Sequence, residues 1–372
     1  MKVAKRGKKA AKRIVIVLAA LAGCVLLVFL LLLIRSTGKV RVFMDQEGNV
    51  MPNSLSEKVF VEINGSRQGM FIQSENMDNP VLLILHGGPG MPEYFLTGKY
   101  PTGLEKNFTV VWWDQRGAGL SYDKDIKLEE LTLKQYIEDT IAVTNYLRER
   151  FSKEKIYLLA HSFGTYIGIQ AVKEAPELYY AYLAQAQITS QVESERLAYD
   201  YMLKYYQEKG DEKTVKKLAG MEYTSKEYQR IRDSVMHKAG IGTTRDMKSI
   251  EKGVFLESLL SKEYTLKEKI NIWRGRALLK HSSLEQTKWS PDCDIREVVP
   301  EIFVPIYFLS GAYDYTVNYQ MAKDYCKEII APLKAFYTFE NSAHSPMFEE
   351  PERFNEILVK DVLNLSTYLA DD

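Results

Sequence analysis

The longest hydrophobic run of the chain lies near its amino terminus. Residues 14–34 read IVIVLAALAGCVLLVFLLLLI, 21 positions without a charged or strongly polar side chain. As a helix rising ~1.5 Å per residue, this run is about 31 Å long and matches the ~30 Å hydrocarbon core of a bilayer. A buried core helix of that length normally carries a polar face, and this run has none. We therefore predict a membrane-spanning helix over residues 14–34.

Beyond residue 57 the hydrophobic residues occur in short blocks of strand length. VFVEI and GMFIQ flank Asn64-Gly65-Ser66, which predicts a hairpin. Continuous apolar runs, typical of buried parallel strands, follow at residues 81–85, 109–113, 156–160, 182–186, 304–309 and 335–339. Residues 131–151 instead show the helical spacing expected of a crossover helix between two such strands. These patterns together predict an α/β fold with a mostly parallel sheet.

The stretch from residue 188 to residue 300 has a different character. It is rich in Tyr, Lys, Glu and Leu and has few β-branched runs, which predicts several helices. A helical insertion between two strands of one sheet is placed to act as a lid over the strand ends. The expected organisation is a basic segment 1–13, a membrane helix 14–34, a stalk or edge segment 35–57, a first core part 58–187, a helical cap 188–300 and a second core part 301–372.

The charges of the chain are unevenly distributed. Lysine and arginine balance aspartate and glutamate at 49 each, but residues 1–13 hold seven bases and no acid. The remaining 42 bases against 49 acids give the rest of the chain a formal charge of −7, so we expect no nucleic-acid partner. By the positive-inside rule the basic segment stays in the cytoplasm, and the body lies on the outer face of the membrane.

Two alternatives to an uncleaved anchor are open. A cleaved signal peptide has a shorter apolar region and a small-residue cleavage site, and neither is present here. Leu21-Ala22-Gly23-Cys24 resembles a bacterial lipoprotein signal, in which Cys24 would carry the lipid. Ten apolar residues follow Cys24 where a lipoprotein should turn polar, which favours the anchor. Both forms place the body on the outer face.

The three cysteines exclude a disulfide-dense scaffold. Cys24, Cys293 and Cys326 are far apart in the sequence, and no CxxC or HExxH spacing is present. We therefore expect no metal site.

A serine between a predicted strand and a predicted helix carries the first chemical signal. Ala160-His161-Ser162-Phe163-Gly164 matches the nucleophile elbow G-x-S-x-G except that Ala160 replaces the first glycine. Such an elbow exposes the serine oxygen on a tight turn at the end of a strand. The alternative interpretation of Ser162 is a simple helix cap, because serine is a good residue at that position.

Three further segments complete a catalytic pattern. His86-Gly-Gly-Pro-Gly90 follows a strand and lets backbone N–H groups approach a ligand; with the N–H of Phe163 it can form an oxyanion hole. Asp314 and His344 each follow a predicted strand, in the chain order serine, acid, histidine of α/β-hydrolases. Of the five histidines, only His344 lies after a strand-end acid in the carboxy-terminal part. We predict Ser162 as nucleophile, His344 as base and Asp314 as its orienting acid.

These motifs resemble those of α/β-hydrolases of the proline iminopeptidase type. The resemblance rests on His86-Gly-Gly-Pro-Gly90, on Trp113-Asp-Gln-Arg-Gly-Ala-Gly-Leu-Ser121, and on Ser162, Asp314 and His344, and it extends over residues 57–368. It implies the same triad, with the N–H groups of Gly88 and Phe163 as oxyanion donors and Gly87 as a further candidate. It also implies that His86, Asp114 and Arg116 are scaffolding near the site, with Asp114 and Arg116 in a buried ion pair that shapes the loop. The elbow and the amino-terminal anchor depart from the family pattern.

The resemblance implies an aminopeptidase that cleaves amino-terminal residues from short peptides through an acyl-enzyme, without a cofactor. Such an enzyme needs carboxylates to bind the substrate ammonium group. Glu93, Glu193 and Glu195 are the candidates from their positions after the glycine loop and at the lid entrance. Alternatives are a carboxylesterase or lipase-like hydrolase of small esters or amides, and a non-catalytic membrane-tethered binding protein on the same scaffold.

Overall fold

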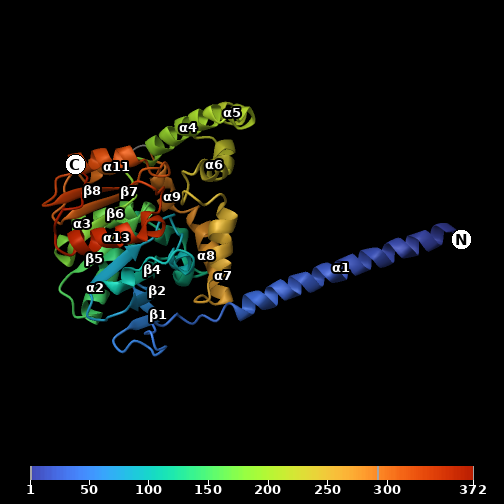
Figure 1. The fold of residues 1–372 in the computed structure, drawn as a ribbon, viewed down its shortest axis with the longest axis horizontal. Helices are drawn as coiled ribbons and strands as arrows, with labels where there is room; N and C mark the ends of the chain where they lie inside the picture. The colour runs from blue at the N-terminus through green and yellow to red at the C-terminus, as the bar shows by residue number, and fades with distance from the viewer. Residues whose placement is uncertain (1, 291–292, 372) are drawn as a thin grey trace.

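A computed structural model describes residues 2–290 and 293–371, with side chains from Arg13 onward. Its centre is one eight-stranded sheet in the order β1-β2-β4-β3-β5-β6-β7-β8 (Figure 1). The β1–β2 and β2–β4 pairs are antiparallel and the others are parallel, which confirms the mostly parallel sheet. The strands are β1 Leu55–Ile63, β2 Ser66–Ser74, β3 Val81–Leu85, β4 Thr109–Asp114, β5 Ile156–His161, β6 Tyr179–Gln185, β7 Ile306–Gly311 and β8 Lys334–Phe339.

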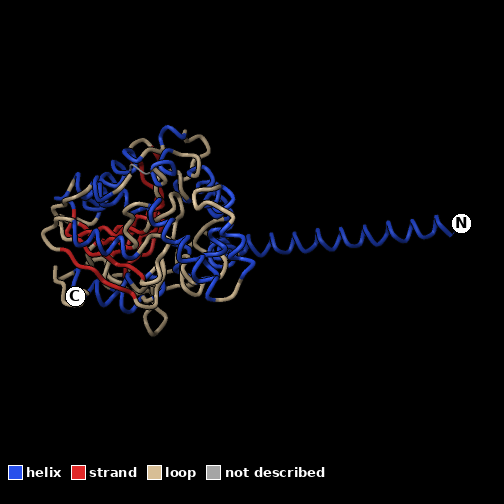
Figure 2. The backbone as a smooth tube through the Cα atoms, turned by 90° about the horizontal axis from the view of Figure 1, so that it is seen from above, coloured by secondary structure: helices blue, strands red, loops and turns tan. Residues whose placement is uncertain are grey.

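The central strands β3, β4 and β5 are buried at every position because both faces of the sheet are covered. In β3, Leu83 and Leu85 belong to one hydrophobic cluster, while Leu82 and Ile84 belong to the other. The first cluster includes residues of α2 Leu133–Arg150, α3 Phe163–Glu174 and α11 Tyr319–Glu328, and the second includes α12 Pro346–Glu349 and α13 Pro351–Ile357. Figure 2 shows the strands enclosed between these helical layers.

Short helical turns connect several of these elements. The 3₁₀ turns are η1 Tyr94–Gly98, η2 Leu104–Lys106, η3 Gly119–Ser121, η4 Leu128–Glu130 and η5 Pro176–Leu178, and the π turns are η6 Glu251–Phe255 and η7 Leu358–Val362. The hairpin between β1 and β2 turns at Asn64 and Gly65, whose φ angles are 47° and 71°. Positive φ at both central residues is typical of a type I′ turn, which matches the right-handed twist of the paired strands.

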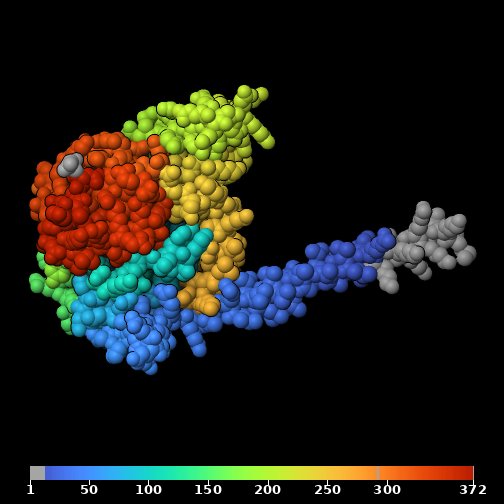
Figure 3. All heavy atoms as spheres, in the orientation of Figure 1, coloured from blue at the N-terminus to red at the C-terminus, as the bar shows by residue number. Residues whose placement is uncertain are grey.

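The segment between β6 and β7 consists mainly of helices and lies beside the sheet; it is called the lid below (Figures 1 and 3). Its helices are α4 Gln191–Glu208, α5 Glu212–Ala219, α6 Lys226–Ala239, α7 Leu256–Leu260, α8 Leu266–Leu279, α9 Ser283–Lys288 and α10 Ile295–Val298. The helices α4, α5 and α6 share a small hydrophobic core of their own around Met202, Leu218 and Tyr228. This separate core belongs to α4–α6, whereas Leu279 and Ile272 of α8 are part of the two clusters that cover the sheet.

Helix α1 Lys2–Ile34 projects from the body in Figures 1 and 2. Its part Arg13–Ile34 has a mean hydropathy of 3.3 and no residue buried against the rest of the chain, so it is long and apolar enough to cross a membrane or to serve as a signal sequence. The basic segment 1–13 is continuous with this helix from Lys2 onward.

The segment after α1 is attached to the lid at its beginning. Lys269 of α8 donates to the Arg35 carbonyl at 3.2 Å and to Ser36 Oγ at 3.0 Å. Two residues later, the Gly38 N–H donates to the Lys262 carbonyl at 3.0 Å. The predicted stalk thus begins on the lid, and from Leu55 it is already part of β1.

Candidate active site

Ser162 occupies the sharp turn between β5 and α3. Its φ of 54° and ψ of −125° are strained for a residue with a side chain, and its N–H donates to the Gln185 carbonyl of β6 at 3.0 Å. This conformation is that of a nucleophile elbow rather than an ordinary helix cap, because the Ser162 side chain makes no capping hydrogen bond.

Small residues permit the turn. A Cβ on Gly164 would lie 2.4 Å from the Leu85 carbonyl oxygen, so α3 approaches the end of β3 more closely than any side chain allows. Ala160, which replaces the first glycine of the motif, is fully buried. Its methyl group faces Gly168 one helical turn further along α3, where a Cβ would lie only 3.0 Å away. The departure at Ala160 is therefore accommodated by a glycine on the facing helix.

Asp314 and His344 meet at the same end of the sheet. His344 Nδ1 donates to Asp314 Oδ2 at 2.8 Å, and Asp314 Oδ1 accepts the N–H groups of Thr316 and Val317 at 2.9 Å each. These bonds fix the carboxylate and place the proton of the neutral His344 ring on Nδ1. Burial lowers the pKa of His344, and the Asp314 charge opposes that effect only in part. The ring is thus held neutral with Nε2 free to accept a proton.

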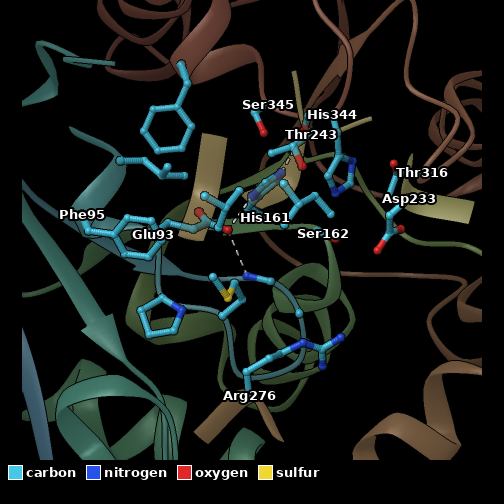
Figure 4. Close-up of a pocket in the computed structure, with 18 of the residues that line it drawn as sticks. Glu93, Phe95, His161, Ser162, Asp233, Thr243, Arg276, Thr316, His344 and Ser345 are labelled. Atoms are coloured by element: carbon cyan, nitrogen blue, oxygen red, sulfur yellow. Dashed lines mark hydrogen bonds and ion pairs between the residues drawn. The ribbon is translucent and has the colours of Figure 1, made fainter. Parts of the chain in front are cut away.

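Ser162 and His344 line one cavity of about 480 Å³ (Figure 4). Their side chains share no hydrogen bond in the described chain, and such nucleophile–base bonds often tighten only when substrate binds. The apolar part of the wall is formed by Met91, Phe95, Leu96, Ile250, Val254, Trp273 and Phe348. The cavity therefore combines the candidate nucleophile, the candidate base and a hydrophobic pocket of the size that small ligands occupy.

The glycine loop passes directly over Ser162. A Cβ on Gly87 would lie 2.8 Å from Ser162 Cβ. The Gly87 N–H donates to Glu93 Oε1 at 3.2 Å and is not available to an oxyanion, contrary to the expectation for Gly87. Gly88 and Phe163 remain the candidate oxyanion donors, since Gly88 lines the cavity and Phe163 is the first residue of α3.

Glu93 forms a buried pair with His161 in the same cavity. Its Oε1 lies 2.7 Å from His161 Nδ1, and His161 Nε2 donates to the His344 carbonyl at 2.8 Å. Burial favours the neutral form of each group, but their mutual attraction outweighs it, so the pKa of His161 is raised and that of Glu93 is lowered. The pair is therefore ionic, and Glu93 Oε2 is buried without a hydrogen-bond partner in the described chain.

The other two candidate acids lie outside the cavity with Ser162. Glu195 is fully buried in the lid, where it accepts from Arg232 Nε at 2.7 Å and from the Tyr228 hydroxyl. Glu193 is half exposed and lies 3.7 Å from Arg296. Of the three candidates, the fold brings only Glu93 to the cavity.

The three expected scaffold residues are buried behind the site. His86 accepts the Gln115 N–H at Nε2 (3.1 Å), which ties the glycine loop to the end of β4. Arg116 forms a buried ion pair, but with Asp139 of α2, at 2.7 Å, and not with Asp114. Asp114 instead accepts the Leu120 N–H at 2.8 Å, and burial raises the pKa of its carboxyl to about 8. The expected Asp114–Arg116 pair is thus wrong, because Arg116 reaches α2 and the β1–β2 hairpin, whereas Asp114 bonds within its own loop.

One bracing residue was not foreseen from the sequence. Glu349 Oε2 accepts the N–H groups of Ala343 and Ser345, at 2.9 and 3.1 Å, on either side of His344. Burial raises the pKa of Glu349 to about 7. The sequence signal for this contact is weak, since it consists of a glutamate five residues after the candidate catalytic histidine.

Comparison with known proteins decides the family. Residues 80–351 match the family model described as the alpha/beta hydrolase fold. The chain belongs to the α/β-hydrolase family. A probable aminopeptidase of Bacillus subtilis (strain 168), YbaC, is 34% identical over 303 residues, covering 80% of this chain and 93% of that protein. A proline iminopeptidase of Heyndrickxia coagulans is 22% identical over 321 residues, covering 82% and 98%. The resemblance to proline iminopeptidases is confirmed.

Solved structures agree with the fold of this α/β-hydrolase. A proline iminopeptidase of Mycobacterium smegmatis superimposes with a TM-score of 0.56 at 14% identity, covering 83% of this chain and 98% of that one. The structure of VinJ gives a TM-score of 0.60 at 17% identity, covering 83% and 99%. At such identities the likeness concerns the fold alone, which is the predicted α/β-hydrolase fold.

Proposed function

We propose that this α/β-hydrolase is a serine aminopeptidase that removes amino-terminal residues from short peptides. The observation that carries the proposal is the convergence, in one cavity, of strained Ser162, the oriented base His344 and the unpartnered carboxylate oxygen of Glu93. The aminopeptidase names of the relatives that cover most of the chain support the same activity.

The chemistry follows from the orientation of each group. His344 Nε2 accepts the Ser162 hydroxyl proton as Oγ attacks the substrate carbonyl carbon. The N–H groups of Gly88 and Phe163 stabilise the resulting oxyanion, each donor contributing roughly 10²–10³ in rate. The imidazolium then protonates the leaving amine, and the C–N bond breaks to give an acyl-enzyme. Water, activated by His344, hydrolyses this ester and restores Ser162.

Glu93 is the group that gives the site its preference for a free amine. Oε1 is engaged by His161 and Gly87, whereas Oε2 has no partner in the described chain. An ammonium group of the substrate satisfies this buried oxygen by a charge-assisted hydrogen bond. The apolar wall beside it, including Phe95 and Trp273, then takes the side chain of the first substrate residue.

The activity is tested with matched substrates and the full chain in detergent micelles. Prolyl and alanyl nitroanilides are compared with their amino-blocked forms and with a short-chain ester, using Ser162→Ala as the control. The proposal predicts release from the free-amine substrates that is lost on blocking and in Ser162→Ala. Cleavage of the ester alone would instead indicate a carboxylesterase. If no substrate is cleaved and a serine-directed phosphonate does not label Ser162, a binding protein remains.

We further propose that residues 14–34 anchor the chain in a bilayer with residues 1–13 in the cytoplasm and the body outside. Seven bases precede the apolar run, and the run is exposed along its length. The test is membrane association of Cys24→Ser after alkaline carbonate extraction. If the chain has an uncleaved anchor, Cys24→Ser stays in the membrane, and its body is accessible to protease added to intact cells. If the chain is a lipoprotein, Cys24→Ser cannot be lipidated and is lost from the membrane fraction.

A further inference from the structure

A second cavity, of about 740 Å³, adjoins the cavity that contains Ser162. It lies in the lid, and the two cavities share four lining residues, namely Asp233, Arg276, Lys280 and Lys288. A substrate chain that leaves Ser162 in this direction therefore passes a wall with three cationic side chains and one carboxylate.

In the described chain, the three carboxylates that line this second cavity are in ion pairs with two arginines. Asp233 lies 2.9 Å from Arg232, and Glu195 accepts from the same arginine. Glu285 lies 3.3 Å from Arg276. By contrast, Lys280 and Lys288 form no ion pair within residues 2–290 and 293–371. Five cations thus face three carboxylates around the second cavity, and the two lysines of the shared wall have no direct counter-ion in the described chain.

Two of these cations contact the glycine loop from the lid side. Lys288 Nζ donates to the Gly88 carbonyl at 3.1 Å, and Arg276 Nη1 donates to the Pro89 carbonyl at 3.0 Å. Because Gly88 is a proposed oxyanion donor, these contacts place the cations next to the scissile bond. Figure 4 shows Arg276 set apart from Glu93 in the cavity. The proposed ammonium site and the cationic wall are thus different parts of the site.

The remaining donors of this wall suit a carboxylate. In the described chain, Arg276 uses Nη1 for both of its contacts, with the Pro89 carbonyl and with Glu285. The Nε and Nη2 groups of its guanidinium are therefore left for a carboxylate that binds through both oxygens. Burial lowers the pKa of Lys288 to about 8, against the attraction of Glu285. An anion beside Lys288 offsets that loss of solvation and keeps the ammonium group charged.

We propose that Arg276, Lys280 and Lys288 bind the carboxy-terminal carboxylate of the substrate, so that the enzyme prefers di- and tripeptides with a free carboxylate. This inference rests on the proposed aminopeptidase function. It adds how the enzyme recognises the part of the peptide that leaves after cleavage. Glu93 binds one end of a short zwitterionic peptide and the cationic wall binds the other, which places the first peptide bond at Ser162.

The experiment compares alanylglycine with alanylglycinamide, which differ only in the terminal carboxylate, using the full chain in detergent micelles. The wild type should have a kcat/KM at least roughly tenfold higher for the free acid, mainly through a lower KM, as expected for one charged hydrogen bond. Lys280→Gln should reduce that acid-to-amide ratio several-fold. Lys280 forms no side-chain hydrogen bond or ion pair in the described chain, so its replacement leaves the glycine loop's contacts intact, unlike replacement of Arg276 or Lys288.

Lys267→Gln is the matched control, since Lys267 is an exposed lysine of α8 that lines neither cavity. It should keep the wild-type ratio. Equal kcat/KM for acid and amide, or an unchanged ratio in Lys280→Gln, overturns the carboxylate subsite. In that case, continued cleavage of alanyl nitroanilide leaves the aminopeptidase proposal standing. Failure to cleave the nitroanilide and both peptides overturns the two proposals together.

Discussion

Glu93 and His161 form a buried ion pair, 2.7 Å apart, that links the glycine loop to the loop of the candidate base. One end of the pair accepts the Gly87 N–H, and the other donates to the His344 carbonyl. A single carboxylate thus braces two parts of the site, while its other oxygen, Oε2, is buried without a hydrogen-bond partner in the described chain. Glu93 therefore holds the two loops together and is also the residue that we propose to bind the substrate ammonium group.

Replacing Glu93 by glutamine tests its contact with the substrate ammonium. The amide oxygen of Glu93→Gln still accepts the Gly87 N–H, but the negative charge is lost. We expect kcat/KM for alanyl nitroanilide to fall about 10–100-fold, the range for a lost charge-assisted hydrogen bond. Hydrolysis of an amino-blocked ester should change much less. Glu193→Gln, at a half-exposed glutamate outside the cavity, should match the wild type, and equal losses on both substrates would assign Glu93 a purely structural role.

The acidic limb of the pH profile reports His344. Only the neutral ring can accept the Ser162 proton, and burial lowers the pKa of His344 below its ordinary value of 6.5 despite the Asp314 charge. Activity is therefore present above this lowered pKa and is lost as the pH falls through it. We expect the midpoint of the acidic limb of kcat/KM below pH 6.5, measured on an ester without an ionisable amine. A midpoint above pH 6.5 would contradict the assignment.

The close approach of α3 to β3 predicts an unusual effect of adding one methyl group. Alanine is normally the better helix residue by about 1 kcal/mol. Gly164→Ala would nevertheless place its Cβ 2.4 Å from the Leu85 carbonyl oxygen, which is backbone and cannot rotate away. We expect a loss of about 1–3 kcal/mol in unfolding free energy and a marked fall in kcat. Denaturant unfolding and nitroanilide assays measure both, with Gly98→Ala, where a Cβ meets open space, expected to be neutral.

Much of the fold and part of the site follow from local sequence patterns. The apolar runs predict the parallel strands because each strand is buried on both faces, and the Ser162 elbow is visible because its glycine spacing is local. The partner of Arg116 is not visible, since Asp139 is on a separate helix and is selected only when α2 packs against the turn. The contacts of Arg276 and Lys288 with the glycine loop join residues nearly 200 positions apart and depend on how the lid closes.

Asp139 also gives a prediction about stability. Its carboxylate accepts hydrogen bonds from Arg116, Asn64, Gln68 and Gln135, all within 2.7–2.9 Å. Asp139→Ala would leave the Arg116 guanidinium buried without a counter-charge, so we expect a loss of about 3–5 kcal/mol in unfolding free energy. Denaturant unfolding of the full chain in detergent measures this loss. Asp125→Ala, at an exposed aspartate, should unfold like the wild type, and a cost below about 1 kcal/mol for Asp139→Ala would refute the argument.

Lys269 gives the molecule an unusual mechanical arrangement. Its fully buried ammonium group joins the end of α1, through Arg35 and Ser36, to the Leu259 carbonyl of the lid. Where α1 is embedded in a bilayer, these bonds hold α8, which carries Trp273 and Arg276 of the cavity wall, close to the membrane surface.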